Sequence, residues 1–320
     1  MRRATVLIPT HSHGPLLRLA AESALGQTVD DVEVFIVLDG ADAITTDVAT
    51  EVARSDDRVH VFAFTKGQRH GEAYRDLVLQ EARGRIVCYL SDDDLWFPDH
   101  VEYLDELLTD ADFAHSLSVI AEVDGGFSTP HIGNLGSSWY RSWLQGPANF
   151  IPLSAAGHTL DAYRSLPVGW SPAPADLWTD LHMWRKFILA PGMRLVSGGR
   201  PTVVHLPSPA RFDMSVAARL AEMELWCARL SRRDACEQLR TDVTDQLVAL
   251  AAELQQWLAD RSAEVETLQG RAAEVETLQA ELSALRSSRA YRAARRLTRI
   301  PIVGRIARWL GKALAAREGR

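Results

Sequence analysis

Residues 85–94, RIVCYLSDDD, indicate the fold: a short apolar run ends in a cluster of acids. Three similar runs precede it, ATVLIPT (4–10), VEVFIVLD (32–39) and RVHVFAF (58–64), separated by amphipathic segments at 16–25, 44–53 and 71–81. Strands that alternate with helices are typical of βαβ units, and continuously apolar strands fit a sheet covered on both faces. The sequence therefore predicts an α/β domain around a mostly parallel sheet.

Size and composition limit the protein classes that remain. The chain has 320 residues, 47% hydrophobic and 24% charged, enough for one domain of about 200 residues and something smaller. No apolar run approaches the roughly 18 residues of a membrane span, and the start turns polar too early for a secretory signal. We therefore expect a cytoplasmic protein, and interpret Cys88, Cys227 and Cys236 as structural thiols because they lack zinc-ligand spacing.

The predicted α/β domain covers residues 1–209. Its second part, from about residue 124, is irregular and holds five of the nine tryptophans. Such a composition suits a loop-rich half with a pocket, in which the tryptophans serve either as core or as platforms for a ligand.

Residues 210–285 are predicted to be helical and to form a coiled coil. The heptapeptide AEVETLQ occurs at 263 and again at 273, and apolar residues recur at steps of three and four. The ten-residue offset equals a heptad plus three, a stammer that overwinds the supercoil. The sequence leaves open whether this region forms a homo-oligomer or folds back on the domain.

Residues 286–320 form a basic tail, with eleven Arg or Lys against the single acid Glu318. Pro301 can open a helix whose apolar side, with Trp309, faces away from most of the arginines. Such a helix fits an anionic membrane surface, which would place the protein peripherally on the inner membrane face. Alternatively it packs on the coiled coil. Nothing in the sequence supports nucleic-acid binding.

Polar residues follow the apolar runs, where a parallel sheet binds its ligands. They include Thr10 and His11, Asp39, a turn at 66–71, and the run 92–94. Clustered carboxylates repel one another unless a cation neutralises them, and such ligands select Mg²⁺ or Mn²⁺ over zinc. The alternative is that these acids cap a helix that begins near Pro98.

Three segments, IPTHSHGPLLRLAAESALGQT, VFIVLDGAD and YLSDDDLWFPDHVEYL, resemble in order and spacing the donor half of inverting family 2 glycosyltransferases of the GT-A fold. The resemblance covers residues 4–108 well and 150–206 more weakly. It implies a Rossmann-like sheet flanked by helices, a nucleotide-sugar donor and a divalent metal, Mn²⁺ or Mg²⁺. It also implies that Asp39 reads the nucleotide base and that Pro9, Thr10 and His11 line the nucleotide pocket.

The same resemblance assigns the acidic run. Ser91 stands where the family usually has its first Asp, so the motif is displaced by one residue. Asp92 would then meet the ribose or diphosphate and Asp93 would ligate the metal. Asp94 serves either as a further ligand or as a helix cap, and His205 matches a histidine that contacts the metal or diphosphate.

Two arginines in GQRHGEAYRDLVLQEA are candidates for the donor phosphates. Arg69 and Arg75 lie where the family has a basic turn, and guanidinium groups bind phosphate in a bidentate manner. The alternative is that Arg75 only pairs with Asp76 or Glu72 on a solvated helix.

The segment PADLWTDLHMWRKFI resembles the family's acidic stretch before a Trp-containing helix. It identifies Asp180 as the base that deprotonates the acceptor hydroxyl, with Thr179 in place of the customary Glu. His182 is a rival base. His158, Trp170 and Trp178 are candidates for contacts with the acceptor.

The expected function is the metal-dependent, inverting transfer of a sugar from a UDP-, GDP- or dTDP-linked donor to a hydroxyl acceptor. The acceptor would be a saccharide, a lipid-linked molecule or a protein in surface polysaccharide, glycolipid or glycoprotein assembly. One alternative is a non-catalytic adaptor that assembles through the coiled coil. The other, a nucleotidyltransferase, lacks the expected Gly-rich loop with lysine, because residues 8–14 read IPTHSHG.

Overall fold

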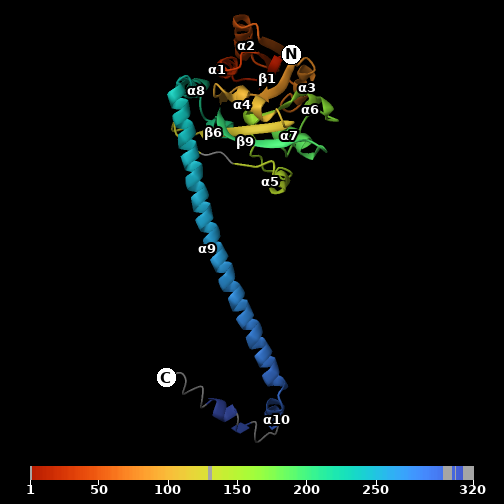
Figure 1. Cartoon of the computed structure of the whole chain (residues 1–320), viewed down its shortest axis with the longest axis vertical. Coiled ribbons are helices and arrows are strands. Elements are labelled where there is room, and N and C mark those ends of the chain that lie inside the picture. Colours follow the sequence, from red (N-terminus) through yellow and green to blue (C-terminus); the bar gives the residue numbers. More distant parts are fainter. Residues whose placement is uncertain (1, 129–131, 298–304, 307, 313–320) are drawn as a thin grey trace. The chain divides into compact units, whose positions relative to one another are not determined.

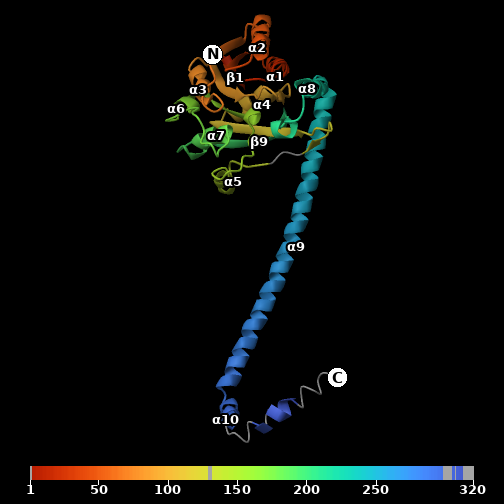
Figure 2. The same cartoon turned by 180° about the vertical axis from the view of Figure 1, so that it is seen from behind.

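The structure of the chain is a computed structural model that describes residues 2–128, 132–297, 305–306 and 308–312. It contains two compact units, residues 1–247 and 248–320. The first unit holds one sheet with helices on both sides, as Figures 1 and 2 show from opposite directions. The division between the units falls inside the long helix α9 (Arg233–Ser287).

The first half of the sheet is parallel, as predicted. Strands β1 (Arg2–Thr10), β2 (Val32–Asp39), β3 (Val59–Phe64) and β4 (Gly84–Tyr89) lie in the order β3-β2-β1-β4. Helices α1 (Leu16–Leu25), α2 (Ala43–Ser55) and α3 (Glu72–Leu79) connect them, close to the predicted bounds. The carboxyl ends of β2, β1 and β4 consequently lie side by side.

The second half is mixed rather than mostly parallel, which corrects the prediction. The order continues as β4-β8-β6-β9-β5, with β5 (Leu95–Trp96), β6 (Phe113–Ala121), β8 (Ala156–Thr159) and β9 (Leu195–His205). Strand β8 is antiparallel to both β4 and β6, β5 is antiparallel to β9, and β7 (Phe127–Ser128) pairs with β6. The short strand β8 has the sequence AGHT, which carries no apolar run.

Helices cover the sheet on both faces because successive strand residues point to opposite sides. On one face Val6 and Ile8 pack with α1, α2 and α4 (His100–Leu107). On the other face Leu7 packs with α3, α6 (Leu160–Ser165) and α7 (Thr179–Leu189). The side chains of Val6, Leu7 and Ile8 are fully buried. Burial of each one contributes about 1.5–3 kcal/mol to the free energy of folding. The remaining short elements are α5 (Ser138–Trp143), η1 (Leu153–Ala155) and η2 (Ser208–Arg211).

The first compact unit extends beyond the predicted boundary at residue 209. Helix α8 (Val216–Leu230) begins at the Ser215 cap, whose side chain accepts from the Ala218 amide. Its buried residues Met223 and Trp226, with Leu239 of α9, complete a third core cluster next to α1 and β5. This apolar contact holds α8 and the start of α9 on the α/β domain.

In the second unit α9 continues to Ser287 and is followed by α10 (Arg289–Leu297). The long helix agrees with the predicted helical region, and the residues of the predicted coiled-coil stripe, such as Leu268 and Leu278, are exposed. Pro301, Ile302, Val303 and Ala313 of the predicted tail helix lie outside the described residues. Within the described ranges, no helix is both long and apolar enough to cross a bilayer.

Candidate active site

A cavity of about 520 Å³ opens where β1, β2 and β4 end, opposite the first residues of α7. Most of the residues predicted to belong to the site line it. These are Pro9, Thr10, His11, Asp39, Arg69, Arg75, Asp92, Asp93, Trp178 and Asp180. Four predicted residues, Asp94, His158, Trp170 and His205, do not line it.

Asp39 is held by the turn that follows β3. Lys66 donates from Nζ to Asp39 Oδ2 at 2.6 Å, and the Gly67 amide donates to Oδ1 at 2.6 Å. Gly71, with φ +69°, lies so close that a Cβ there would be 2.7 Å from Asp39 Cγ. The ring of His11 is bonded to the Asp39 carbonyl oxygen at 2.8 Å. Asp39 is therefore a rigidly placed carboxylate in the cavity wall.

Thr10, the last residue of β1, is buried and lines the cavity next to Asp39. Its Oγ1 has no hydrogen-bond partner among the described residues. Buried hydroxyl groups are normally hydrogen-bonded, so this atom is suited to contact a ligand in the cavity.

The two predicted phosphate-binding arginines are fixed by backbone carbonyls rather than by acids. Arg69, with a positive φ of 56°, donates to the carbonyls of Ala175 and Leu177. Arg75 is buried, donates to the His70 carbonyl at 3.1 Å and lies 4.7 Å from the centre of the Trp170 ring.

The alternative role for Arg75, an ion pair on a solvated helix, does not fit its surroundings. Asp76 accepts from the Tyr163 hydroxyl at 2.5 Å, and Glu72 accepts from the His70 amide and the Thr179 hydroxyl. Burial lowers the pKa of Arg75. In the part of the chain that is described, the Nε atoms of Arg69 and Arg75 have no partner. Both guanidinium groups can therefore still bind an anion.

Asp94 and His205, which were predicted as metal ligands, form a pair with each other and do not line the cavity. Asp94 accepts from Ser154 Oγ at 2.5 Å and from the Leu206 amide at 2.9 Å, and His205 Nδ1 is 3.0 Å from both of its carboxylate oxygens. Burial opposes ionisation of Asp94, but His205 and these hydrogen bonds bring its pKa below the usual value. Protein groups thus already surround this carboxylate.

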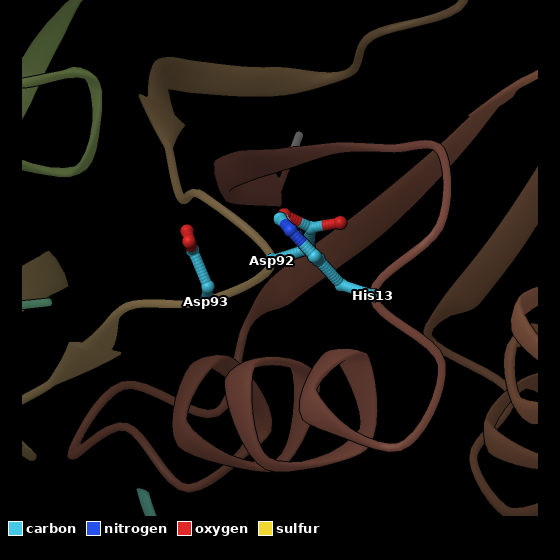
Figure 3. Close-up of side chains that lie close together, drawn as sticks. All are labelled: His13, Asp92 and Asp93. Atoms are coloured by element: carbon cyan, nitrogen blue, oxygen red, sulfur yellow. The ribbon is translucent and has the colours of Figure 1, made fainter. Parts of the chain in front are cut away.

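Asp92 and Asp93 face the cavity together with His13, from the loop after β1 (Figure 3). His13, Asp92 and Asp93 each offer one potential ligand atom, and these three atoms lie within 4.8 Å of one another. His13 Nδ1 is 2.7 Å from Asp92 Oδ1. The two carboxylates suit Mn²⁺ or Mg²⁺ by their chemistry, and the imidazole is a further potential ligand. His13 was not predicted as a ligand from the sequence, although it follows β1, the strand next to β4.

Asp93 has an unusual environment for a carboxylate. Burial, together with the charges of Asp94 and Asp92, raises the pKa of Asp93 to about 6. Its Oδ2 accepts from Ser208 Oγ at 2.7 Å and from Arg219 Nη2 at 2.7 Å. Strongly shifted carboxylates in a cleft are typical of functional sites.

Asp180 lies at the start of α7 and lines the same cavity. Asn149 donates to its Oδ2 at 3.0 Å and the Leu181 amide donates to its Oδ1 at 2.8 Å. Burial raises the pKa of Asp180 to about 6. The rival base His182 does not line the cavity; its Nε2 is 3.5 Å from Ser171 Oγ.

The three predicted acceptor residues have different positions. His158 is fully buried, with Nε2 2.6 Å from the Tyr89 hydroxyl and Nδ1 2.9 Å from the Thr159 carbonyl, so it belongs to the core. Trp170 donates from Nε1 to the Tyr89 hydroxyl, and its ring lies against the Arg75 guanidinium group. Trp178, which is 64% exposed, lines the cavity. Of these three residues, Trp178 alone lines the cavity.

Comparisons with known proteins agree with this geometry. Residues 5–155 match the family model for Glycosyl transferase family 2. The chain is 31% identical over 100 residues to EpsH of Bacillus subtilis, covering 31% of this chain and 28% of EpsH. It is 28% identical over 94 residues to the GalNAc(5)-diNAcBac-PP-undecaprenol beta-1,3-glucosyltransferase of Campylobacter jejuni, covering 29% and 30% of the two chains.

A third relative is the succinoglycan biosynthesis protein ExoW of Rhizobium meliloti, 30% identical over 103 residues, 32% of each chain. The chain thus spans less than a third of these relatives. A crystal structure of S. aureus TarS 1-349 is similar with a TM-score of 0.52 and 15% identity, covering 69% of this chain and 70% of that one. This likeness shows a shared fold, and the family match with the named relatives supports a glycosyltransferase.

Proposed function

We propose that the chain transfers a sugar from a nucleoside-diphosphate donor to the hydroxyl group of an acceptor, with inversion at the anomeric carbon. The observation that carries this proposal is the convergence of Asp39, Asp92, Asp93 and Asp180 on one cavity. Asp39 ends β2, and Asp92 and Asp93 follow β4, the parallel strands on either side of β1, and open α/β sheets bind nucleotides at such strand ends. Asp180, at the start of α7, lines the same cavity.

The nucleoside end of the donor binds between β1 and β2 in this proposal. Asp39 accepts from the base and the Thr10 hydroxyl contacts the nucleoside, with Pro9 and His11 beside it. Arg69 and Arg75 bind the diphosphate, which would give their unpaired Nε atoms an acceptor. S. aureus TarS has been crystallised in complex with UDP-GlcNAc, and that structure matches with a TM-score of 0.50 at 14% identity.

Asp92 and Asp93, with His13, would hold a divalent cation, Mn²⁺ or Mg²⁺. When bound, the cation supplies the positive charge that stabilises a leaving diphosphate. The buried carboxylates of this cluster gain a counter-charge from it, which fits the raised pKa of Asp93.

Asp180 acts as the base. Its pKa of about 6 keeps it ionised at neutral pH and still basic enough to accept a proton. The acceptor oxygen attacks the anomeric carbon while the bond from that carbon to the diphosphate oxygen breaks, and the hydroxyl proton passes to Asp180. Asn149 and the Leu181 amide hold the carboxylate in place.

The acceptor side is open at Trp178, whose exposed ring can stack on a sugar. The names of the relatives from C. jejuni and R. meliloti refer to an undecaprenol-linked glycan and to succinoglycan. We propose an acceptor of the same broad class, a saccharide or a lipid-linked saccharide in surface polysaccharide assembly.

The helical extension would serve localisation. We propose that the exposed stripe of α9 forms a coiled coil with a second copy and that residues 286–320 bind anionic lipid. Pelleting with liposomes that contain anionic lipid, with and without residues 286–320, tests the second part. Equal partitioning of both proteins would end the membrane proposal.

The transfer proposal is tested by incubating the full chain with UDP-, GDP- and dTDP-sugars and Mn²⁺ and measuring the release of nucleotide. We expect release from one donor class, faster with acceptor present. No binding and no release with any donor would favour a non-catalytic adaptor.

A further inference from the structure

Arg219 of α8 reaches the proposed cation site from outside the α/β domain predicted from the sequence. Its Nη2 donates to Asp93 Oδ2 at 2.7 Å, and its Nη1 lies 3.3 Å from His13 Nε2. The side chain is 13% exposed. One guanidinium group thus contacts two of the three potential cation ligands.

The fold holds Arg219 in this position. Arg219 lies one turn before Met223 on α8, and Met223 and Trp226 are buried against the α/β domain. Its amide donates to the carbonyl of Ser215, the capping residue. The apolar packing of Met223 and Trp226 fixes the rotation of α8 about its axis. Arg219 is on the same face of the helix and is therefore directed at Asp93.

The contact has a cost, because Arg219 Nε is buried with no hydrogen-bond partner in the described structure. Unpaired buried donors are unfavourable. The compensating interaction is with Asp93, whose carboxylate is buried beside Asp92 and Asp94 and needs a positive charge nearby. Arg219 supplies this charge through its Nη2, 2.7 Å from Asp93 Oδ2.

His13 cannot ligate a cation while it keeps its present contacts. Its Nδ1 is bonded to Asp92 and its Nε2 faces Arg219. A divalent cation held by His13 and Asp93 would take the place of the Arg219 contacts with both residues. The guanidinium would then be within a few ångströms of a double positive charge, and like charges at such distances repel strongly.

We propose that Arg219 competes with the divalent cation for Asp93 and His13, so that cation binding displaces the guanidinium group and loosens the contact of α8 with the site. This inference rests on the proposed cation site. The contact between α8, the helix that precedes α9, and the site would then depend on whether a cation is bound.

The test is a calorimetric titration of the full chain with Mn²⁺ alone. We expect Arg219→Gln to bind Mn²⁺ at least tenfold more tightly than the wild type, and Arg219→Lys to lie between them. Arg229→Gln is the matched control, because Arg229 is also on α8 but contacts Asp242 and the rings of Phe127 and Trp226. Its Mn²⁺ affinity should equal that of the wild type.

Unchanged or weaker Mn²⁺ binding by Arg219→Gln would overturn the competition. If Arg219→Gln does not fold, Arg219→Lys carries the test, and an affinity equal to the wild type would be equally decisive. Absence of Mn²⁺ binding in every variant would refute the cation site and this inference with it. Nucleotide release measured in EDTA then shows separately whether the transfer proposal stands without a cation.

Discussion

Lys66 Nζ lies 2.6 Å from Asp39 Oδ2, although the two residues are 27 positions apart in the chain. The pair fixes the turn after β3 against the end of β2. Gly71 closes the same turn from the other side, with no room for a Cβ beside the Asp39 carboxyl group. The geometry of this turn therefore determines where the Asp39 carboxylate lies, and with it where the proposed contact with a nucleotide would form.

Gly71→Ala should weaken nucleotide binding at least tenfold, because the new methyl group would push Asp39 away. The φ of +69° at this position also makes alanine cost about 1–2 kcal/mol of stability. Gly192→Ala is the matched control: φ is +79° there and no atom lies within 4 Å of the new Cβ. Calorimetry with nucleoside diphosphates should show weaker binding in Gly71→Ala only. Thermal unfolding should show a loss of stability in both variants, greater in Gly71→Ala because its Cβ also meets Asp39. Equal nucleotide affinities would contradict the role of Asp39.

The reaction rate should depend on the ionisation of Asp180, whose pKa is raised to about 6 by burial. Only the ionised form accepts a proton, so kcat should be near its maximum above pH 7 and fall about tenfold per pH unit well below pH 6. The measurement is kcat with saturating donor and Mn²⁺ between pH 5 and 8. Asp180→Asn should lower kcat by roughly 10²–10⁴. A variant that keeps wild-type kcat would exclude Asp180 as the base.

Truncation of His158 should lower stability, whereas truncation of Trp178 should weaken acceptor binding. His158→Ala removes a fully buried ring and its hydrogen bond to Tyr89, and should lower the free energy of unfolding by about 3 kcal/mol. Trp178→Ala removes an exposed ring at the cavity, and should change stability by less than about 0.5 kcal/mol while raising the acceptor KM several-fold. Denaturant unfolding and steady-state kinetics separate the two effects. An unchanged acceptor KM in Trp178→Ala would remove its proposed role.

The first half of the fold was predictable because buried parallel strands are continuously apolar. Strands β1 to β4 correspond to the predicted runs at 4–10, 32–39, 58–64 and 85–94. The helices between them were predicted from the amphipathic spacing of their residues. Strands β5 and β8 have two and four residues and gain their conformation from neighbouring strands. No local pattern marks such strands, and the mixed half of the sheet was therefore missed.

The site was predictable where it depends on strand ends. Asp39, Asp92 and Asp93 follow apolar runs directly, and the order of a parallel sheet brings those ends together. His13 and Arg219 meet the acids only through packing of distant segments, 79 and 126 residues away. The one sequence signal for Arg219 was a charged residue on the buried face of α8, four positions before Met223.

The separate positions of Asp93 and Asp94 also needed the structure. Consecutive residues after a strand point in different directions, and only tertiary contacts decide which one faces the cavity. Here Ser154, His205 and the Leu206 amide surround Asp94, whereas Asp93 lines the cavity.

The central claim is that Asp93 helps to bind a nucleoside diphosphate through a divalent cation. Its most direct test is calorimetric titration of the wild type and Asp93→Asn with UDP, GDP and dTDP, each with Mn²⁺ and with EDTA. We predict that the wild type binds one of these nucleotides at least tenfold more tightly with Mn²⁺, and that Asp93→Asn, still folded, loses this difference. Metal-dependent binding that survives unchanged in Asp93→Asn would contradict the account.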